Sequence, residues 1–375
     1  MKVIVIGAGI GGLAAAVALQ RKSIDVRVFE RAAEMTEVGA GISLWANALH
    51  ALDQLGVGDA IRAASSPYEV AGLRTAEGEI LASVSSADLE RQFGVATIIT
   101  HRADLLGALL RAVKPGSVRP GKELLGVRQA SGRVTATFAD GSFAEADACI
   151  GADGLRSVVR TTLHGSHPPR YAGCTAWRAV VHFSSELVRA SESWGHGSVF
   201  GQVPMSGGRV YWYATRNGPE GGRNADEKAE LLRLFGAWHR PILPLIEAAD
   251  PQTILRNDIY DRPPLRRWGE GRVTLLGDAA HPMTPYLGQG GCQALEDAVV
   301  LGQCLSAGTD VEAGLRAYER QRIPRTRQFV QRSRQAGRIA QLQHPGAVAL
   351  RNAIFRRIPA SFQSAQLGRM IGYRV

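Results

Sequence analysis

A glycine-rich turn near the N-terminus constrains the fold of this chain more than any other feature. Residues 7–12 read Gly-Ala-Gly-Ile-Gly-Gly, matching GxGxxG, between the apolar run Val3–Ile6 and the Ala- and Leu-rich segment Gly11–Arg21. A strand that passes through such a turn into a helix is typical of a dinucleotide-binding βαβ unit, because the glycines let a pyrophosphate approach the helix N-terminus. The next expected strand, Asp25–Glu30, ends in a carboxylate that suits the hydroxyls of a ribose.

Length and composition exclude several classes of protein. With 375 residues, 45% hydrophobic and 21% charged, the chain is globular and long enough for at least two domains. The N-terminus does not read as a secretion signal and no apolar run is long enough to cross a membrane, so we expect a cytoplasmic protein. Four cysteines without CxxC spacing predict neither a disulfide framework nor a metal site.

The net charge of +10 raises the question of an anionic partner. The positive charges are spread along the chain and are mostly Arg, and no basic-aromatic interleaving accompanies them. We therefore expect no nucleic-acid partner. The partly apolar, Arg-rich tail 336–375 is expected to pack on its own domain, with contact to an anionic membrane as the alternative.

The order of the expected elements indicates an α/β fold with one domain inserted into another. A discontinuous, Rossmann-like nucleotide-binding domain is expected over 1–70, 97–170 and 269–335, a β-rich substrate domain over 71–96 and 171–268, and C-terminal helices over 336–375. The clearest expected helices are His101–Val113, Asp226–Trp238, Gly290–Leu305 and Val311–Ala340, and the clearest strands of the inserted domain are Cys174–Phe183, Ser198–Pro204 and Arg209–Thr215.

Two further glycine turns carry a resemblance to a known family. Gly151-Ala152-Asp153-Gly154 follows one expected strand, and Gly277-Asp278-Ala279-Ala280-His281-Pro282 follows another, with Pro285-Tyr286-Leu287-Gly288-Gln289-Gly290-Gly291 just after it. Together with GxGxxG, in this order, they resemble the motifs of single-component (class A) FAD-dependent aromatic hydroxylases and monooxygenases. That family includes para-hydroxybenzoate, salicylate and urate hydroxylases and zeaxanthin-epoxidase-like proteins. The resemblance runs from residue 3 to about residue 330.

The resemblance implies that these segments hold one FAD. Asp278 would accept hydrogen bonds from the ribityl chain, and Arg102 would fork onto the phosphates. The glycines before the helix at 290 would bring amides and a positive dipole end to the flavin ring. The implied contacts are Gly7, Gly9, Ile10, Gly11, Gly12, Glu30, Arg31, Gly39, Ala40, Gly41, Ile42, Arg102, Val127, Asp153, Gly154, Asp278, Pro285, Gly288, Gly290, Gly291 and Cys292. For Asp153, a turn-forming role remains an equal alternative.

The implied activity is that of the family. NAD(P)H visits transiently, since no second GxGxxG exists, and reduces the flavin; O2 then forms a flavin C4a-hydroperoxide. One oxygen atom hydroxylates or epoxidises an electron-rich aromatic, heteroaromatic or polyene-like small molecule, and the other leaves as water. The alternatives are a flavin oxidase, reductase or halogenase on the same scaffold, or a non-catalytic binding protein. The segment Tyr211-Trp212-Tyr213-Ala214-Thr215 does not match the WxWxI motif of the halogenating relatives.

A reactive oxygenated flavin requires a water-poor pocket with a few orienting polar groups. The candidate pocket residues in the inserted domain are Trp177, Arg178, Tyr211 and Tyr213. Arg178 would steady a phenolate or carboxylate, and Tyr213 would hydrogen-bond the substrate. His281 would relay a proton, or else cap its turn structurally, and Pro285 would lie against the ring near its reactive carbon. No general base stands out.

Overall fold

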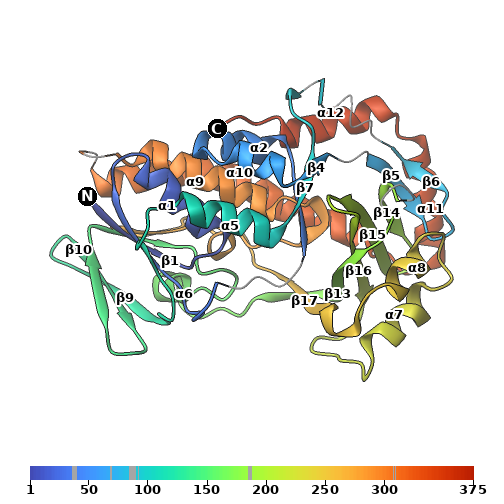
Figure 1. Cartoon of the computed structure of the whole chain (residues 1–375), viewed down its shortest axis with the longest axis horizontal. Coiled ribbons are helices and arrows are strands. Elements are labelled where there is room, and N and C mark those ends of the chain that lie inside the picture. Colours follow the sequence, from blue (N-terminus) through green and yellow to red (C-terminus); the bar gives the residue numbers. More distant parts are fainter. Residues whose placement is uncertain are drawn as a thin grey trace.

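A computed structural model describes residues 1–35, 40–67, 70–83, 90–91, 93–184, 188–306, 308 and 310–375 of the chain. Two sheet-based regions lie at opposite ends of the long axis, and helix α10 (Val311–Ala340) runs along the molecule between them (Figure 1). This helix packs on α9 (Gly290–Cys304) in the first region and reaches the second through the ion pair of Arg334 with Asp261. The α/β class expected from the sequence is confirmed.

The first region is built on a five-stranded parallel sheet with strand order β18-β12-β1-β2-β8. Its strands are β1 (Lys2–Ile6), β2 (Asp25–Phe29), β8 (Val118–Arg119), β12 (Ala148–Gly151) and β18 (Val273–Leu275). β1 is β-branched and almost wholly buried, as is usual for a parallel strand covered on both faces. A three-stranded antiparallel sheet, β9 (Leu124–Ala130), β10 (Arg133–Phe138) and β11 (Phe143–Ala146), packs against β1 and β12 on the side away from helix α1 (Figure 1).

Helices cover the other side of the parallel sheet. They are α1 (Ile10–Gln20), α2 (Ala46–Leu55), α3 (Gly58–Ala63), α5 (Arg102–Ala112) and α9, while α6 (Val158–His164) packs on β9. Helix α1 is rich in Ala and buried almost all round, so it presents small side chains to its neighbours. At Gly302 of α9, a Cβ atom would lie 3.0 Å from the Cβ of Ala18, which shows how closely α1 and α9 pack.

The second region is a seven-stranded sheet with strand order β17-β13-β16-β15-β14-β5-β6. The strands are β5 (Val70–Thr75), β6 (Ile80–Ala82), β13 (Arg170–His182), β14 (Ala190–Trp194), β15 (Ser198–Met205), β16 (Arg209–Asn217) and β17 (Leu255–Asp261). Strands β14 and β17 are not among the elements expected from the sequence. Helices α7 (Glu227–Phe235) and α8 (Ile242–Glu247), followed by the 3-10 turn η2 (Pro251–Thr253), lie over one face, where Trp212 and Phe235 are fully buried.

The opposite face of this sheet meets the first region. A small sheet of β3 (Gly41–Leu44), β4 (Ser66–Pro67) and β7 (Ile98–His101) lies against it, and Ile99 of β7 packs with Val203 and Tyr211. The remaining short turns, η3 (Gly277–Ala279) and η4 (Pro285–Leu287), follow β18. The seven-stranded sheet therefore has one face packed by helices and one face turned toward the glycine motifs.

The tail forms two helices, α11 (Pro345–Arg357) and α12 (Ala360–Ile371), which return along the molecule (Figure 1). Met370 and Ile371 are buried against Phe329 of α10, and the guanidinium of Arg351 lies 5.1 Å from the ring centre of Trp194. The tail thus packs on its own chain. No described helix is both long and apolar enough to cross a membrane.

Candidate active site

The three glycine turns follow three neighbouring parallel strands. Gly7 follows β1, Ala152 follows β12 and Leu276 follows β18, and these strands are adjacent in the sheet. Backbone hydrogen bonds continue past the strand ends, from Ala152 N to Ile6 O at 2.8 Å and from Leu276 N to Gly151 O at 2.9 Å. Because carboxyl ends of parallel strands meet at one edge, the turns converge where α/β sheets bind ligands.

The glycines of the first turn divide into two kinds. Gly7 has a φ of +99°, and a Cβ there would lie 2.5 Å from the carbonyl oxygen of Ala152. A Cβ on Gly12 would overlap the carbonyl oxygen of Gly7. A Cβ on Gly9 would meet no described atom within 4 Å. Gly7 and Gly12 are therefore required by packing, whereas Gly9 borders open space that a ligand could occupy.

Two helix N-termini lie side by side at this edge. Gly9 precedes α1, Gln289 precedes α9, and neither helix has a described side-chain cap. A Cβ on Gly11 would touch the side chains of Leu276 and Ala294, which places the start of α1 against that of α9. Uncapped N–H groups and two positive dipole ends make this edge attractive to an anion such as a pyrophosphate.

Glu30 sits at the end of β2 beside the first turn. Its carboxylate accepts hydrogen bonds from the backbone N–H groups of Ala8 at 2.8 Å and Ala32 at 2.9 Å. A carboxylate has about four acceptor positions, so it can still accept from a ribose hydroxyl. Arg31, the next residue, is exposed, and Gly39 lies outside the described residues.

Asp278 follows β18 and is accessible to solvent, as are Pro285 and Gly288 nearby in the chain. The protein around it nevertheless raises the pKa of Asp278 by desolvation, while the charges of His281 and Arg102 act in the opposite direction. Arg102 begins α5, and its backbone N–H donates to Ala40 O at 2.9 Å. Asp278 and Arg102 are thus brought close enough to interact electrostatically, from opposite ends of the sequence.

The strand β3 lies against the start of α9. A Cβ on Gly291 would lie 2.8 Å from Cδ1 of Ile42, and a Cβ on Gly288 would lie 3.2 Å from Nε1 of Trp45. That indole nitrogen is buried and has no hydrogen-bond partner among the described residues. Cys292 is fully buried, and burial raises the pKa of its thiol to about 12, so it is a packing residue rather than a nucleophile.

The face of the seven-stranded sheet turned toward β3 carries three of the four expected pocket residues. Tyr211 packs against the small sheet: a Cβ on Gly41 would lie 2.6 Å from the Tyr211 ring. Burial raises the pKa of Tyr211, while the positive charges of Arg178 and Arg102 act to lower it. The Tyr211 and Tyr213 ring centres lie 5.8 Å apart. Arg178, Tyr211 and Tyr213 therefore form one group beside the glycine motifs.

Trp177 corrects the sequence-based expectation. Its side chain lies on the other face of the sheet, in the core with Phe200 and Trp212, and its Nε1 donates to Glu227 of α7 at 2.8 Å. Successive residues of a strand point to opposite faces, so Trp177 and Arg178 cannot both line one pocket.

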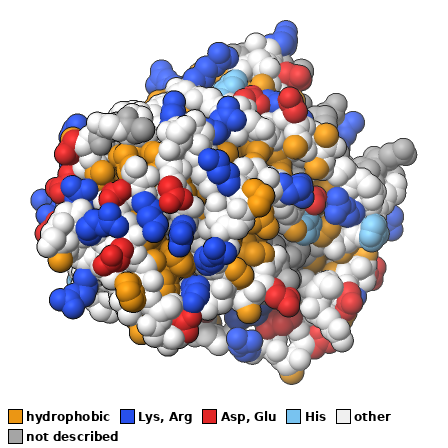
Figure 2. Space-filling view, turned by 60° about the vertical axis from the view of Figure 1, so that its left-hand side comes forward, with side chains coloured by type: hydrophobic (Ala, Val, Ile, Leu, Met, Phe, Trp, Pro, Cys, Tyr) orange, Lys and Arg blue, Asp and Glu red, His pale blue; other side chains and the backbone are white. Residues whose placement is uncertain are grey.

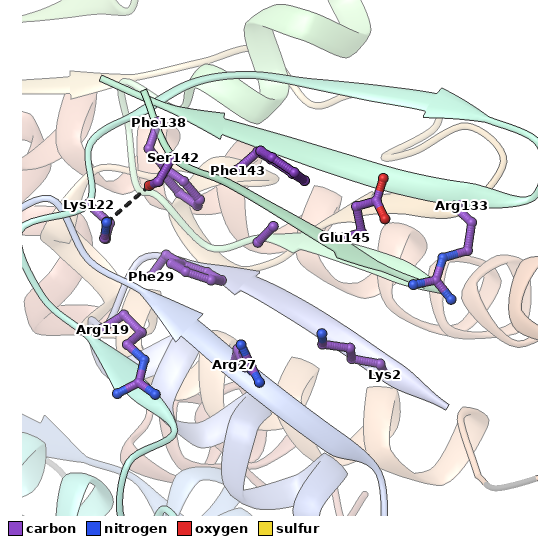
Figure 3. Close-up of a pocket in the computed structure, with 11 residues that line it drawn as sticks. Lys2, Arg27, Phe29, Arg119, Lys122, Arg133, Phe138, Ser142, Phe143 and Glu145 are labelled. Atoms are coloured by element: carbon purple, nitrogen blue, oxygen red, sulfur yellow. Dashed lines mark hydrogen bonds between the residues drawn. The ribbon is translucent and has the colours of Figure 1, made fainter. Parts of the chain in front are cut away.

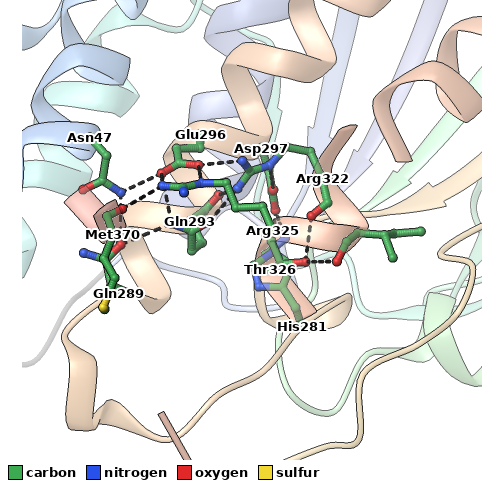
Figure 4. Close-up of polar contacts among 12 residues, drawn as sticks. Asn47, His281, Gln289, Gln293, Glu296, Asp297, Arg322, Arg325, Thr326 and Met370 are labelled. Carbon is green, nitrogen blue, oxygen red and sulfur yellow. Dashed lines mark hydrogen bonds and ion pairs between the residues drawn. The ribbon is translucent and has the colours of Figure 1, made fainter. Parts of the chain in front are cut away.

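His281 is held in a buried polar network (Figure 4). Its Nε2 lies 2.6 Å from Asp297 Oδ2, an oxygen that also accepts from the backbone N–H of Gly277 at 3.0 Å. Asp297 is paired in turn with Arg322, at 2.7 Å. The imidazole therefore fixes the turn that carries Asp278. This supports the structural role for His281 over the proton relay, and we do not propose it as a catalytic residue.

The network extends to helix α2 through Asn47. Arg322 and Arg325 both pair with Glu296, at 2.5 Å and 2.7 Å, and Glu296 Oε1 accepts from Asn47 at 2.6 Å (Figure 4). Although burial alone would raise it, Arg322 and Arg325 hold the pKa of Glu296 below its usual value. The charges balance within the core, beneath the start of α9.

Asp153 is occupied by its own loop. Its carboxylate accepts from Ser157 Oγ at 2.5 Å and from the backbone N–H groups of Val158 and Val159 at 2.7 and 3.2 Å, at the start of α6. This favours the turn-forming role of its side chain. Val127 lies in β9 opposite Ala136 and is buried in the main core, so only its backbone can be offered to a cofactor.

Sequence reasoning missed two polar residues on the tyrosine-bearing face. Glu192 of β14 receives a hydrogen bond from Tyr213 Oη at 2.5 Å. Tyr286 Oη lies 3.2 Å from Cys174 Sγ and 3.0 Å from Gln341 Nε2, so it ties η4 to β13 and to the end of α10. Both partnerships join distant segments and leave no local signal in the sequence.

A separate surface pocket of about 410 Å³ lies between β2, β8 and the three-stranded sheet (Figure 3). It is lined by Lys2, Arg27, Phe29, Arg119, Lys122, Arg133, Phe138, Ser142, Phe143, Ala144 and Glu145. Elsewhere at this end of the molecule, basic side chains are interleaved with acidic and apolar ones (Figure 2). Among the described residues, no group of three or more His, Cys, Asp or Glu side chains could hold a metal ion.

Comparison with known proteins identifies relatives of this arrangement. The family described as FAD binding domain matches residues 1–333. Aurachin C monooxygenase/isomerase of Stigmatella aurantiaca is 41% identical over 376 residues, covering 100% of this chain and 98% of that protein. FAD-dependent urate hydroxylase of Klebsiella pneumoniae is 40% identical over 342 residues, covering 89% of each chain.

The fold has a close match among solved structures. The crystal structure of Klebsiella pneumoniae HpxO complexed with FAD and uric acid superimposes with a TM-score of 0.93 at 36% sequence identity, over 99% of this chain and 96% of the other.

Proposed function

The chain belongs to the FAD binding domain family, and on that premise we propose that it uses NAD(P)H and O2 to oxygenate an electron-rich aromatic, heteroaromatic or polyene-like small molecule. It is an FAD-dependent monooxygenase, an oxidoreductase like its relatives. When bound, FAD accepts hydride from the nicotinamide and activates O2. The side chains of this chain have the remaining tasks of holding the cofactor, orienting the substrate and excluding water.

The observation that carries the proposal is the convergence of three glycine turns and two uncapped helix N-termini at one sheet edge. The arrangement fits a dinucleotide. Gly9 leaves open space at the start of α1, where a pyrophosphate meets unpaired N–H groups. Arg102, Glu30 and Asp278 supply a cation and two carboxylates at the same edge, which suit phosphates and hydroxyls respectively.

We assign the cofactor contacts accordingly. The turn at Gly7–Gly12 and Arg102 hold the phosphates, Glu30 holds the adenosine ribose, and Asp278 holds the ribityl chain. The segment Pro285–Gly291, which leads into α9 and is exposed at Pro285 and Gly288, would contact the flavin ring, as would Ala40–Ile42. Val127 and Gly154 are kept as backbone contacts.

The substrate is assigned to the sheet face that carries Arg178, Tyr211 and Tyr213. Tyr211, packed against Gly41, closes one side of this site against water. Arg178 supplies a fixed positive charge beside Tyr211 and orients an anionic oxygen of the substrate. The face suits a flat polar ring better than an aliphatic chain, because its polar groups would be left unpaired by a purely apolar ligand.

The test is turnover by the purified holoenzyme with NADH or NADPH. The substrate panel is urate, salicylate, 3-hydroxybenzoate and 3-amino-4-hydroxybenzoate, chosen for oxidisable rings. We expect at least one panel member to accelerate NAD(P)H oxidation and to yield a product carrying one atom from ¹⁸O-labelled O2. Hydrogen peroxide equal to the NAD(P)H consumed, with no labelled product, would instead show an oxidase. A colourless protein that FAD does not reconstitute would show a binding protein.

Arg178→Ala tests the substrate site separately. We expect KM for the accepted panel substrate to rise about 10- to 100-fold, since a charge-assisted hydrogen bond is worth about 1.5–3 kcal/mol. FAD content should not change. The control is Arg233→Ala, which removes an exposed arginine of α7 that pairs with its helix neighbour Glu230 at 2.6 Å. Equal kinetics for Arg178→Ala and wild type would remove Arg178 from the site.

A further inference from the structure

Four residues stand opposite one another across four neighbouring strands. Arg178 of β13 is opposite Tyr213 of β16, Tyr213 is opposite Gly201 of β15, and Gly201 is opposite Glu192 of β14. Residues directly opposite in a sheet share a face, so these four form one row on the face assigned to the substrate. The row has a cation at one end and a carboxylate at the other.

Gly201 lets Tyr213 span the row. A Cβ atom at Gly201 would overlap the phenol ring and lie 2.5 Å from Tyr213 Oη, so the ring crosses the strand where a side chain is missing. The hydroxyl of Tyr213 on β16 thereby passes over β15 to β14, where it donates to Glu192 Oε2 at 2.5 Å. Because Tyr213 donates its proton to Glu192, its oxygen keeps lone pairs that can act as acceptors.

Glu192 is a half-buried carboxylate held by neutral donors. Its other oxygen, Oε1, accepts from Nε1 of Trp194 at 2.5 Å. Burial raises the pKa of Glu192, and the hydrogen bonds from Tyr213 and Trp194 offset part of that effect. The cations on neighbouring elements contact the partners of Glu192. Arg178 lies opposite Tyr213, and Arg351 of α11 stacks on the Trp194 ring.

Such a carboxylate is unfavourable for stability alone. A carboxylate that is partly withdrawn from water and bonded to neutral donors loses solvation that these hydrogen bonds only partly replace, and a neutral side chain of the same shape would cost less. Groups of this kind are characteristic of sites that move protons. Two other candidates for a base are already engaged, since His281 is fixed by Asp297 and Asp153 by its own loop.

We propose that Glu192, acting through Tyr213, takes up a proton from the substrate, and that the substrate therefore carries an ionisable hydroxyl or ring N–H. This inference rests on the proposed function and narrows its substrate class. The substrate O–H or N–H bond breaks and its proton bonds to Tyr213 Oη, while the proton of Tyr213 passes to Glu192 Oε2. One negative charge moves from Glu192 to the substrate, and nothing is oxidised or reduced in this step.

The direction of the transfer suits the reaction. A substrate anion conjugated with the ring is richer in electrons at carbon and reacts faster with an electrophilic oxygen. Arg178, at the other end of the row, faces the anion that forms. A polyene hydrocarbon has no proton to give, so the row favours a phenol or a hydroxylated or lactam-type heteroaromatic ring. Glu192 is a positioning residue, because it reaches the substrate only through Tyr213.

The test is Glu192→Gln in the FAD-loaded enzyme with the fastest panel substrate. We expect kcat/KM at pH 7 to fall about 100-fold, the usual contribution of acid–base assistance. The ratio of wild-type to variant activity should shrink toward one as pH rises above the substrate's own pKa, because the substrate then arrives ionised. Tyr213→Phe should lose a similar factor, and the double variant should lose no more than either one.

The matched control is Glu220→Gln. Glu220 also accepts a hydrogen bond from a tyrosine of this sheet, Tyr260 at 2.7 Å, but it is exposed at the far edge. It should keep wild-type kinetics at every pH. Glu192→Asp, which keeps the acid but shortens its reach, should recover activity only partly.

Three outcomes would overturn the inference. One is wild-type kcat/KM in Glu192→Gln at pH 7. Another is a loss that persists unchanged at alkaline pH, or that comes with a lower melting temperature and lost FAD, which would make Glu192 structural. The third is oxygenation of a panel member in which O–H and N–H groups are all methylated, at the rate of its parent. If no panel compound is oxygenated, the proposed substrate class fails, and this inference fails with it.

Discussion

The phenol ring of Tyr213 lies over Gly201, where an added Cβ atom would overlap the ring. The two residues are directly opposite on β16 and β15. The absence of a side chain on one strand therefore sets the reach of the tyrosine on the other.

Gly201→Ala should displace Tyr213 from Glu192. We expect kcat/KM to fall as far as in Tyr213→Phe, with FAD content unchanged, and stability to fall by about 1–3 kcal/mol because the added methyl overpacks the face. Steady-state kinetics and urea unfolding measure the two effects. Gly126→Ala is the control. Gly126 is also a strand glycine, in β9, but a Cβ added to it would meet no described atom within 4 Å. Wild-type kinetics in Gly201→Ala would show that the Tyr213 position is not needed.

Alanine at two glycines of the first turn is expected to have different effects, on folding at Gly12 and on FAD binding at Gly9. Gly12→Ala should not fold, because its Cβ would overlap the backbone oxygen of Gly7. Gly9→Ala should fold normally, because its φ of −73° is open to any residue and its Cβ meets no described atom. Its Kd for FAD should nevertheless rise at least 10-fold, as the methyl fills the space of the ligand. Circular dichroism and FAD titration separate these results. Unchanged FAD affinity in Gly9→Ala would place the cofactor elsewhere.

The buried network predicts a large loss of stability on removal of its central cation. Arg322→Met leaves the carboxylates of Glu296 and Asp297 without their shared partner in the core. We expect the free energy of unfolding at pH 7 to fall by about 3–5 kcal/mol. Arg320→Met, an exposed change on the same helix, should have little effect. A difference below about 1 kcal/mol between the two variants would contradict the role given to Arg322.

Glu192 predicts a pH-dependent difference in stability. The pKa of Glu192 is raised in the folded protein. At a pH between the usual pKa of a glutamate and this raised value, the folded chain therefore keeps a proton that the unfolded chain has lost. That proton binding stabilises the fold at low pH, and the contribution is lost as pH rises through the folded pKa. Glu192→Gln should therefore match wild type at about pH 4 and be the more stable protein at about pH 8. Melting temperatures across this range measure it; a variant that is less stable at every pH would contradict it.

The parts of the site that could be predicted are those with local signals. The glycine turns, Asp278 and the long helix at 311–340 each follow from residues adjacent in sequence, because turn chemistry and helical periodicity are short-range. Parallel strands then bring the turns together without further information. The α/β class followed from the same alternation of strands and helices.

The parts that could not be predicted depend on distant pairings. Trp177 and Arg178 were expected in one pocket, although strand alternation allows only one of them to face it, and the choice depended on where α7 packs. Glu192 lies on a strand with no clear apolar alternation, and its partner Tyr213 is on a strand two places away in the sheet. His281 and Asp153 looked reactive until their partners in the fold were known.

The seven-stranded sheet keeps packing and chemistry on separate sides. Along β13 and β16, every second residue is committed to the helices, and the residues between them look toward the cofactor edge. Under the proposed substrate assignment, positions 178, 211 and 213 can therefore change while residues 177 and 212 keep their places in the core. Substitutions at every second position of these strands can thus change substrate preference without disturbing the core that holds the fold together.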